Sequence, residues 1–340
     1  MRTWPRRFSA ASRSRSARGD VTPAPFQRPA AAILPGPSAP VPCAVRHDGG
    51  VQSPLFASAG EVGERLGEVG YLTDDATATT VFLADRLGKP LLVEGPAGVG
   101  KTELAKAVAA ATGSGLVRLQ CYEGIDEARA LYEWDYRKQL LRLQVDRDAG
   151  ETGWETERGH IFSEEFLLAR PLLTAIRQSE PTVLLVDETD KADVEVEGLL
   201  LEVLSDFQVT IPELGTLVAS RRPFVVLTSN ATRELTEALK RRCLYLHLDY
   251  PDAARERAIV LEKVPEAGEQ LAEQVVRTVR ALRAMELKKA PSIAETIDWA
   301  RTLVTLGLDT LDAEAVRTTL GVVLKHASDT VRAGTELKLN

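Results

Sequence analysis

Residues 90–102 read PLLVEGPAGVGKT, an apolar run followed by a glycine-rich turn that ends in lysine and threonine. The turn fits the pattern G-x-x-x-x-G-K-S/T in full, and it lies between a predicted strand and a predicted helix, as a phosphate-binding loop requires. Glycines let backbone N–H groups close around phosphates, and the following helix directs its positive dipole end at the anion. The residues predicted to bind the nucleotide here are Gly95, Pro96, Ala97, Gly98, Val99, Gly100, Lys101 and Thr102.

Lys101 and Thr102 carry the chemistry of this loop. A lysine here places a point charge on the β- and γ-phosphates of ATP, so Lys101 is a candidate catalytic residue as well as a binding residue. The Thr102 hydroxyl is a predicted ligand of Mg²⁺. A plain glycine-rich turn is the alternative, but the complete motif and its flanking elements favour a site for Mg-ATP.

A second predicted part of the site is the apolar run VLLVDE at 183–188, which ends in two carboxylates. Asp187, at the strand end, is predicted to bind the nucleotide and to hold Mg²⁺ through a water molecule. Glu188 is the predicted base that orients or deprotonates the attacking water. Taken alone, such a run is more often a solvated strand end, and the phosphate-binding loop upstream reverses that preference.

Apolar and helical segments alternate along the middle of the chain. Besides a strand at 90–94 and helices at 74–87 and 101–111, strand-like runs lie at 116–121, 182–187, 224–229 and 243–248. Valine- and leucine-rich strands between helices predict a parallel sheet covered on both faces. After residue 251, helical patterns fill 252–264, 267–287, 292–306 and 311–332. We therefore predict a three-layer α/β nucleotide-binding domain at 51–250, followed by a small all-α lid domain at 251–340.

The formal net charge is −7, and eight arginines against two aspartates in residues 1–50 leave an excess of 13 negative charges on the rest. This acidic body argues against a surface that coats nucleic acid, although it does not exclude a basic loop inside a ring pore. No run of about 18 apolar residues occurs, so no transmembrane helix and no membrane partner are predicted. Cys43, Cys121 and Cys243 form no C-x-x-C pair, which predicts a cytoplasmic protein without zinc or disulfides.

Residues 1–50 are rich in Arg, Pro, Ala and Ser and show neither a helical nor a strand period. A segment of this composition cannot bury a core, so we predict a disordered tail. An arginine-rich, acid-poor start is also typical of transit peptides. A start codon assigned too far upstream is a third interpretation, and the sequence does not separate the three.

Several longer stretches carry a more specific pattern: GPAGVGKTELAKAVA, LLVDETDKADVEVEGLLLEVLSDFQVTIPELGT, VVLTSNATRELTEALKRRCLY and PSIAETIDWARTL. Together they resemble the MoxR family of AAA+ ATPases, and within it the CoxD-like branch associated with maturation of molybdenum hydroxylases. The resemblance covers about residues 65–335. It implies a P-loop AAA+ fold that hydrolyses Mg-ATP.

The resemblance also assigns roles to residues outside the two motifs. Asn230 matches the family's sensor 1, a catalytic polar group near the γ-phosphate; a simple turn asparagine is the alternative. Arg242 stands where the family places its catalytic arginine finger, with Arg241 as the alternate, and two solvated arginines at a helix end are the competing interpretation. Residues 208–219 read as two short alternating strands around the turn at 212–215 (PELG), and this matches the hairpin that precedes sensor 1.

Three other regions leave alternatives open. Tyr71 and Leu72 lie where related ATPases cover the adenine, although such a pair is also common in a core. The family's sensor 2 arginine is missing from 290–295 (APSIAE), so one of three basic residues replaces it or the role is absent; they are Lys288, Lys289 and Arg301. Residues 124–160 resemble the family's helical insert, facing either a pore, a partner or the core.

These features together predict an ATP-driven remodeller that assembles with itself as a ring, expected to be a hexamer. A trans-acting arginine requires a neighbour that completes the site. By resemblance, the partners are a von Willebrand A-type protein and a metalloenzyme client. The competing functions are a nucleic-acid motor or loader, a small-molecule kinase and a structural nucleotide-binding module; Glu188 argues against the last two, because neither needs a water-activating base.

Overall fold

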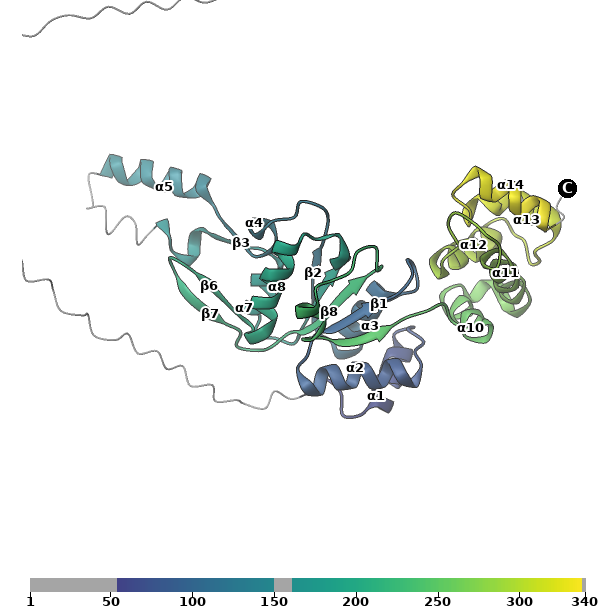
Figure 1. Ribbon diagram of the computed structural model, residues 1–340, viewed down its shortest axis with the longest axis horizontal. Helices are drawn as coiled ribbons and strands as arrows, with labels where there is room; N and C mark the ends of the chain where they lie inside the picture. The colour runs from purple at the N-terminus through teal and green to yellow at the C-terminus, as the bar shows by residue number, and fades with distance from the viewer. Residues whose placement is uncertain (1–53, 150–160, 338–340) are drawn as a thin grey trace, which may run out of the picture. The chain divides into compact units, whose positions relative to one another are not determined.

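The computed structural model describes residues 54–149 and 161–337, so the predictions about residues 1–50 lie outside it. Five strands form the central sheet: β1 (Leu91–Glu94), β2 (Gly115–Gln120), β5 (Thr182–Asp187), β8 (Phe224–Ser229) and β9 (Leu244–His247). Their order is β2-β5-β8-β1-β9, and every neighbouring pair is parallel (Figure 1). The predicted parallel α/β sheet is therefore confirmed.

Side chains of β5 alternate between two buried clusters. Leu184 and Val186 pack with α7 (Pro171–Arg177) and α8 (Val194–Asp206). Val183 and Leu185 pack with the helices of the opposite layer: α1 (Ala59–Glu68), α2 (Asp75–Leu87) and α3 (Lys101–Thr112). Because successive strand residues point to opposite faces, the sheet is covered on both sides and the domain has three layers.

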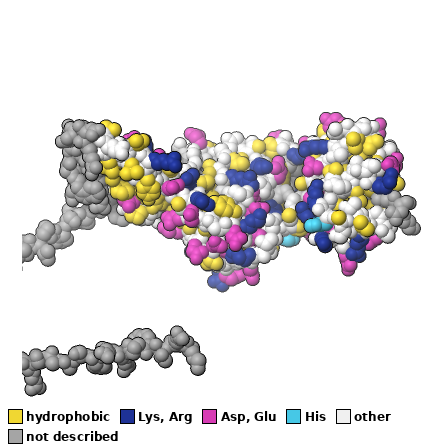
Figure 2. All heavy atoms as spheres, turned by 90° about the horizontal axis from the view of Figure 1, so that it is seen from above, with side chains coloured by type: hydrophobic (Ala, Val, Ile, Leu, Met, Phe, Trp, Pro, Cys, Tyr) yellow, Lys and Arg dark blue, Asp and Glu magenta, His cyan; other side chains and the backbone are white. Residues whose placement is uncertain are grey.

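Two antiparallel pairs extend this domain. β6 (Gln208–Ile211) and β7 (Gly215–Val218) form the hairpin predicted at 208–219. β3 (Tyr132–Trp134) and β4 (Leu167–Ala169) pair next to α4 (Glu127–Ala130), α5 (Tyr136–Ala149) and the short helix η1 (Glu164–Phe166). In this region Trp134 packs in the main core, whereas α5 exposes Tyr136, Leu140, Leu141 and Val145. Figure 2 shows hydrophobic side chains gathered at the end of the molecule that carries α5.

Helices after β9 enclose a separate core around Trp299, which is fully buried and donates its indole N–H to Thr319 Oγ1 at 2.7 Å. The elements are α10 (Ala253–Lys263), η3 (Pro265–Ala267), α11 (Gly268–Arg283), α12 (Ile293–Thr305), α13 (Ala313–Thr319), η4 (Leu320–Val322) and α14 (Ala327–Glu336). We call residues 253–337 the lid. The helical pattern predicted over 311–332 is divided in the structure between α13 and α14, with the short helix η4 around Gly321, a poor helix former, between them.

None of the helices in the described part of the chain is long and apolar enough to span a bilayer.

Candidate nucleotide-binding site

The phosphate-binding loop connects the carboxyl end of β1 to the N-terminus of α3. Gly100 is the N-cap of α3 with a φ of 98°, a left-handed conformation open to glycine. At Gly95, an added Cβ would lie 1.9 Å from the carbonyl oxygen of Leu248, so only glycine fits there. Residues 97–102 line a cavity at the start of α3, where free backbone N–H groups and the helix dipole favour an anion.

Lys101 is buried and points its ammonium group back into the loop. Nζ donates to the carbonyl oxygens of Gly95 (2.7 Å) and Pro96 (2.8 Å) and to Oδ1 of Asn230 (2.8 Å). Burial lowers the pKa of Lys101, and nearby carboxylates act in the opposite direction; in order of strength these are Asp190, Asp187, Glu188 and Glu94. Two of the predicted catalytic residues, Lys101 and Asn230, are therefore in direct contact.

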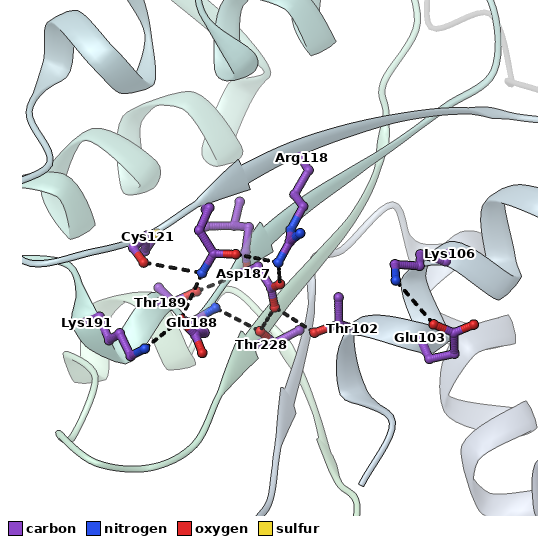
Figure 3. A network of polar contacts seen from close by, with 12 residues as sticks. Thr102, Glu103, Lys106, Arg118, Cys121, Asp187, Glu188, Thr189, Lys191 and Thr228 are labelled. Atoms are coloured by element: carbon purple, nitrogen blue, oxygen red, sulfur yellow. Dashed lines mark hydrogen bonds and ion pairs between the residues drawn. The ribbon is translucent and has the colours of Figure 1, made fainter. Parts of the chain in front are cut away.

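Asp187 lies at the end of β5 and is only 2% exposed. Its Oδ1 accepts hydrogen bonds from Thr102 Oγ1 (2.9 Å) and Thr228 Oγ1 (2.5 Å), and its Oδ2 pairs with the guanidinium of Arg118 (Figure 3). The two predicted magnesium ligands, Thr102 and Asp187, thus lie side by side. Their hard oxygen atoms fit Mg²⁺, which prefers oxygen ligands, keeps several waters and, when bound, offsets phosphate charge.

Glu188 follows in a left-handed conformation with a φ of 58°. Its Oε2 accepts from Gln120 Nε2 (2.8 Å) and Lys191 Nζ (2.7 Å), and its backbone N–H donates to Thr228 Oγ1 at 2.9 Å (Figure 3). The Thr228 hydroxyl therefore connects both acidic residues, accepting from one and donating to the other. The Glu188 side chain lines the cavity in front of the loop, where a base must lie to reach a water beside ATP.

Arg242 is the predicted catalytic residue that the structure does not bring to the others. It is exposed, with Nε donating to Ser205 Oγ (2.8 Å) and a terminal nitrogen to the carbonyl oxygen of Ala238 (3.3 Å). Neither it nor Arg241 is among the described residues that line the cavity. The predicted finger thus lies on the surface, outside the cavity of its own chain.

The cavity has a volume of about 620 Å³, within the range of small-molecule sites. Away from the loop it is lined by Tyr71, Leu72 and two lid residues, Ile259 and Ile297, and burial raises the pKa of Tyr71. Arg255 of α10 connects the lid to this wall: its Nη1 pairs with Asp74, and its Nη2 donates to the carbonyl oxygen of Leu72. An apolar end and a polar end are what a nucleotide base and its phosphates require.

The lid also contacts the loop directly. An added Cβ at Gly98 would lie 2.4 Å from Cβ of Ser292, the N-cap of α12. Of the three basic residues considered for the missing sensor 2 role, only Arg301 lines the cavity. Lys289 instead pairs with Glu295 (3.2 Å), and the backbone N–H of Lys288 donates to Asp329.

Four residues beside the predicted ones were missed: Arg118, Gln120, Asp190 and Thr228. Arg118 and Gln120 are two apart on β2, so they point to the same face, and that alternation was a usable signal. Asp190 and Thr228 gave no local signal, because their partners lie about 40 residues away in the sequence.

Residues 90–243 match the AAA domain (dynein-related subfamily). The chain is 33% identical over 181 residues to the chaperone protein ClpB of Streptomyces albus G, covering 52% of this chain and 19% of ClpB. It is 30% identical over 213 residues to the chaperone protein ClpC1 of Arabidopsis thaliana, and this match covers 59% of this chain and 20% of ClpC1. The chain thus spans about a fifth of the length of these relatives. The RuvB Holliday junction branch migration motor of Thermotoga maritima aligns at 18% identity and a TM-score of 0.38, covering 76% of this chain and 68% of RuvB.

The sheet, the phosphate-binding loop and the matching family therefore define residues 90–243 as an AAA+ ATPase domain. Domains of this class bind ATP with Mg²⁺ and hydrolyse it.

Proposed function

We propose that this chain is an AAA+ remodelling ATPase that works as a ring, expected to be a hexamer. One observation carries the proposal. The cavity gathers a phosphate-binding lysine, a base and a sensor from one chain, whereas the predicted finger, Arg242, lies exposed outside it. A site that lacks this cation in its own chain is completed when a neighbour supplies it, and closed rings do so at every interface.

Within such a site, catalysis depends on positioning and electrostatics. Lys101 offsets charge on the phosphates, Glu188 accepts the proton of the attacking water, and Asn230 holds that water. Arg242 of the neighbour stabilises the charge that develops as the terminal phosphate leaves. The lid contacts the loop at Gly98 and the cavity wall at Leu72, so a change of nucleotide is transmitted to α10 and α12.

We further propose that the motion serves maturation or metal-cofactor loading of a metalloenzyme of the molybdenum hydroxylase type, with a von Willebrand A-type protein as adaptor. The MoxR- and CoxD-like stretches support this client, and the likeness to ClpB and ClpC1, both chaperone proteins by name, supports remodelling of proteins. A cytoplasmic location is part of the proposal and rests on the cysteine spacing of the sequence, which contains no C-x-x-C pair.

The client assignment is tested by producing a molybdenum hydroxylase together with the wild-type chain or with its Glu188→Gln variant, and measuring bound metal cofactor. Only the wild type should raise the cofactor content. Glu195→Gln, which alters an exposed carboxylate on α8, is the matched control and should behave as wild type. Equal cofactor content in all samples, together with ATP hydrolysis that DNA stimulates at low salt, would point to a nucleic-acid motor instead.

A further inference from the structure

Asp190 connects the two turns that carry the proposed base and sensor. It follows Glu188 by two residues, in η2 (Thr189–Lys191), and is 3% exposed. Its Oδ2 accepts from the backbone N–H (3.1 Å) and the hydroxyl (2.5 Å) of Thr232, which lies two residues after Asn230. One buried carboxylate oxygen therefore joins the segment after β5 to the segment after β8.

Each of the joined turns holds a non-glycine residue in a left-handed conformation, Glu188 with a φ of 58° and Ala231 with a φ of 56°. Such conformations are unfavourable and persist only where the surroundings hold them. The N–H of Ala231 donates to Ser229 Oγ (2.9 Å) on one side, and Thr232 is held by Asp190 on the other. The tie to Asp190 is thus part of what keeps the sensor turn in this shape.

The second oxygen of Asp190 argues for a role beyond stability. Oδ1 is buried and makes no hydrogen bond of good geometry among the described residues. Burial opposes the charged form, yet hydrogen bonds from Thr232 and from the backbone N–H groups of Asn230 and Asp190 lower the pKa of Asp190 overall. A buried carboxylate oxygen without a partner is costly, so the hydrogen bonds that Oδ2 makes to Thr232 are kept against an opposing cost. Burial lowers the pKa of Lys101, and among the carboxylates that act in the opposite direction Asp190 has the largest effect, although it does not itself line the cavity.

We propose that Asp190 is a positioning residue for ATP hydrolysis, which fixes the Glu188 turn against the Asn230 turn so that both side chains meet the same water. Asp190 itself touches neither the water nor ATP. If the hydrogen bonds between Asp190 and Thr232 are lost, the phosphate-binding loop still binds ATP. The distance between Glu188 and Asn230, however, is no longer fixed. This inference rests on the ATPase activity and is independent of ring and client.

The test compares steady-state ATPase kinetics with binding of a fluorescent ATP analogue. Asp190→Ala should lower kcat by about tenfold or more, since small misplacements of reacting groups cost that much, while analogue affinity changes by less than about threefold. Asp190→Asn keeps an oxygen that accepts from Thr232 and should retain most of kcat. Asp193→Ala removes an exposed carboxylate that makes no side-chain cap, so it is the matched control and should match wild type.

Thr232→Val removes the hydroxyl but keeps the N–H, so it should lower kcat less than Asp190→Ala and add nothing in the double variant. If Asp190→Ala does not fold, the pair Asp190→Asn and Thr232→Val carries the same comparison. An unchanged kcat in folded Asp190→Ala overturns the proposal. The proposal is also overturned if Asp190→Asn loses as much kcat and as much analogue affinity as Asp190→Ala. The negative charge of Asp190, and not its hydrogen bonds to Thr232, would then be what matters. A wild-type chain without ATPase activity would instead contradict the proposed function.

Discussion

The Glu188 carboxylate shares one oxygen between two donors, the amide of Gln120 and the ammonium of Lys191. Its backbone is fixed by Thr228, from a third element. The direction of this side chain therefore depends on β2, η2 and β8 at once. Fixed polar groups of this kind need little reorganisation during a reaction, which is how a protein site lowers an electrostatic barrier.

Replacing Glu188 by Gln keeps the shape and the hydrogen-bonding oxygen but removes the proton acceptor. We expect ATP to bind while turnover falls by about 10²-fold or more, the usual contribution of a general base. Phosphate release and analogue binding measured on the same preparation check this. An undiminished steady-state rate would remove Glu188 from the mechanism.

Lys101→Ala should abolish ATP binding, because the loop loses the cation that its carbonyl oxygens and Asn230 hold in place. Titration calorimetry with ATP and Mg²⁺ measures this directly. Lys106→Ala is the control, since Lys106 lies further along α3 on the exposed side and pairs with Glu103. Tight ATP binding by Lys101→Ala would refute the role.

The two described cysteines, Cys121 and Cys243, should make the free energy of unfolding fall at alkaline pH. Burial raises the pKa of both Cys121 and Cys243 from 9.0 to about 12, and the charge of Asp187 adds to the effect at Cys121. Because folding favours the neutral thiol, this contribution to stability is complete below pH 9 and is lost as the pH rises toward 12. Urea unfolding at several pH values should therefore show a steeper alkaline decline for the wild type than for Cys121→Ala. Identical slopes would contradict the shift at Cys121.

At the scale of elements, the sequence predicted the central strands of the sheet well, because β1, β5 and β8 are buried on both faces and read as continuous apolar runs. It predicted the hairpin at 208–219 from its alternation and turn. The pairing of β3 with β4 was missed, since each strand has three residues and 32 residues separate Trp134 from Leu167. The break near Gly321 was missed as well, because apolar residues continue at helical spacing on both sides of it.

In the candidate site, too, some residues could be predicted from the sequence and others could not. The loop at 95–102 and the pair Asp187-Glu188 could be predicted, because each is a contiguous motif whose chemistry depends on neighbouring residues. Asp190 and Thr228 could not be assigned, because their contacts join segments 42 and 41 residues apart. Sequence spacing alone does not show which strands become neighbours.

Gly98 offers a test of the contact between lid and loop. Gly98→Ala places a Cβ 2.4 Å from that of Ser292, so α12 must move away or the loop must distort, and ATP affinity should fall. Gly113→Ala is the matched control: its φ of 65° is as unfavourable for alanine as the 74° of Gly98, but no atom lies within 4 Å of the added group. Equal ATP affinities for the two variants would show that the contact has no effect on binding.

At the scale of the whole molecule, the position of Arg242 joins sequence to assembly. If the residue acts on a neighbour's ATP, Arg242→Ala should bind nucleotide normally and hydrolyse it about 10³-fold or more slowly, as for such fingers in related chemistry. If it only caps the end of α9 (Glu237–Lys240), turnover should stay as in wild type. Binding and hydrolysis assays on the single variant separate the two.

A mixing experiment tests the shared site itself. Arg242→Ala subunits keep an intact loop, and Lys101→Ala subunits keep an intact finger, so each population alone should be nearly inactive. In mixed rings, some intact loops receive a working finger and activity should partly return. If labelled subunits exchange and the mixture stays inactive, the assignment fails for Arg242, and Arg241→Ala is mixed in the same way.

Strand β1 is synthesised long before the two strands that flank it in the sheet. Leu91 pairs with Val226 in β8 and with Leu244 in β9, so β1 leaves the ribosome long before either flanking strand is synthesised. Until then Leu91, Leu92 and Val93, all buried in the finished sheet, have no strand to pair with. Pairing over such separations is slow, and waiting apolar strands are prone to aggregate. Nascent chains should therefore require protection by general chaperones, and chains stopped before Leu244 should be recovered as aggregates.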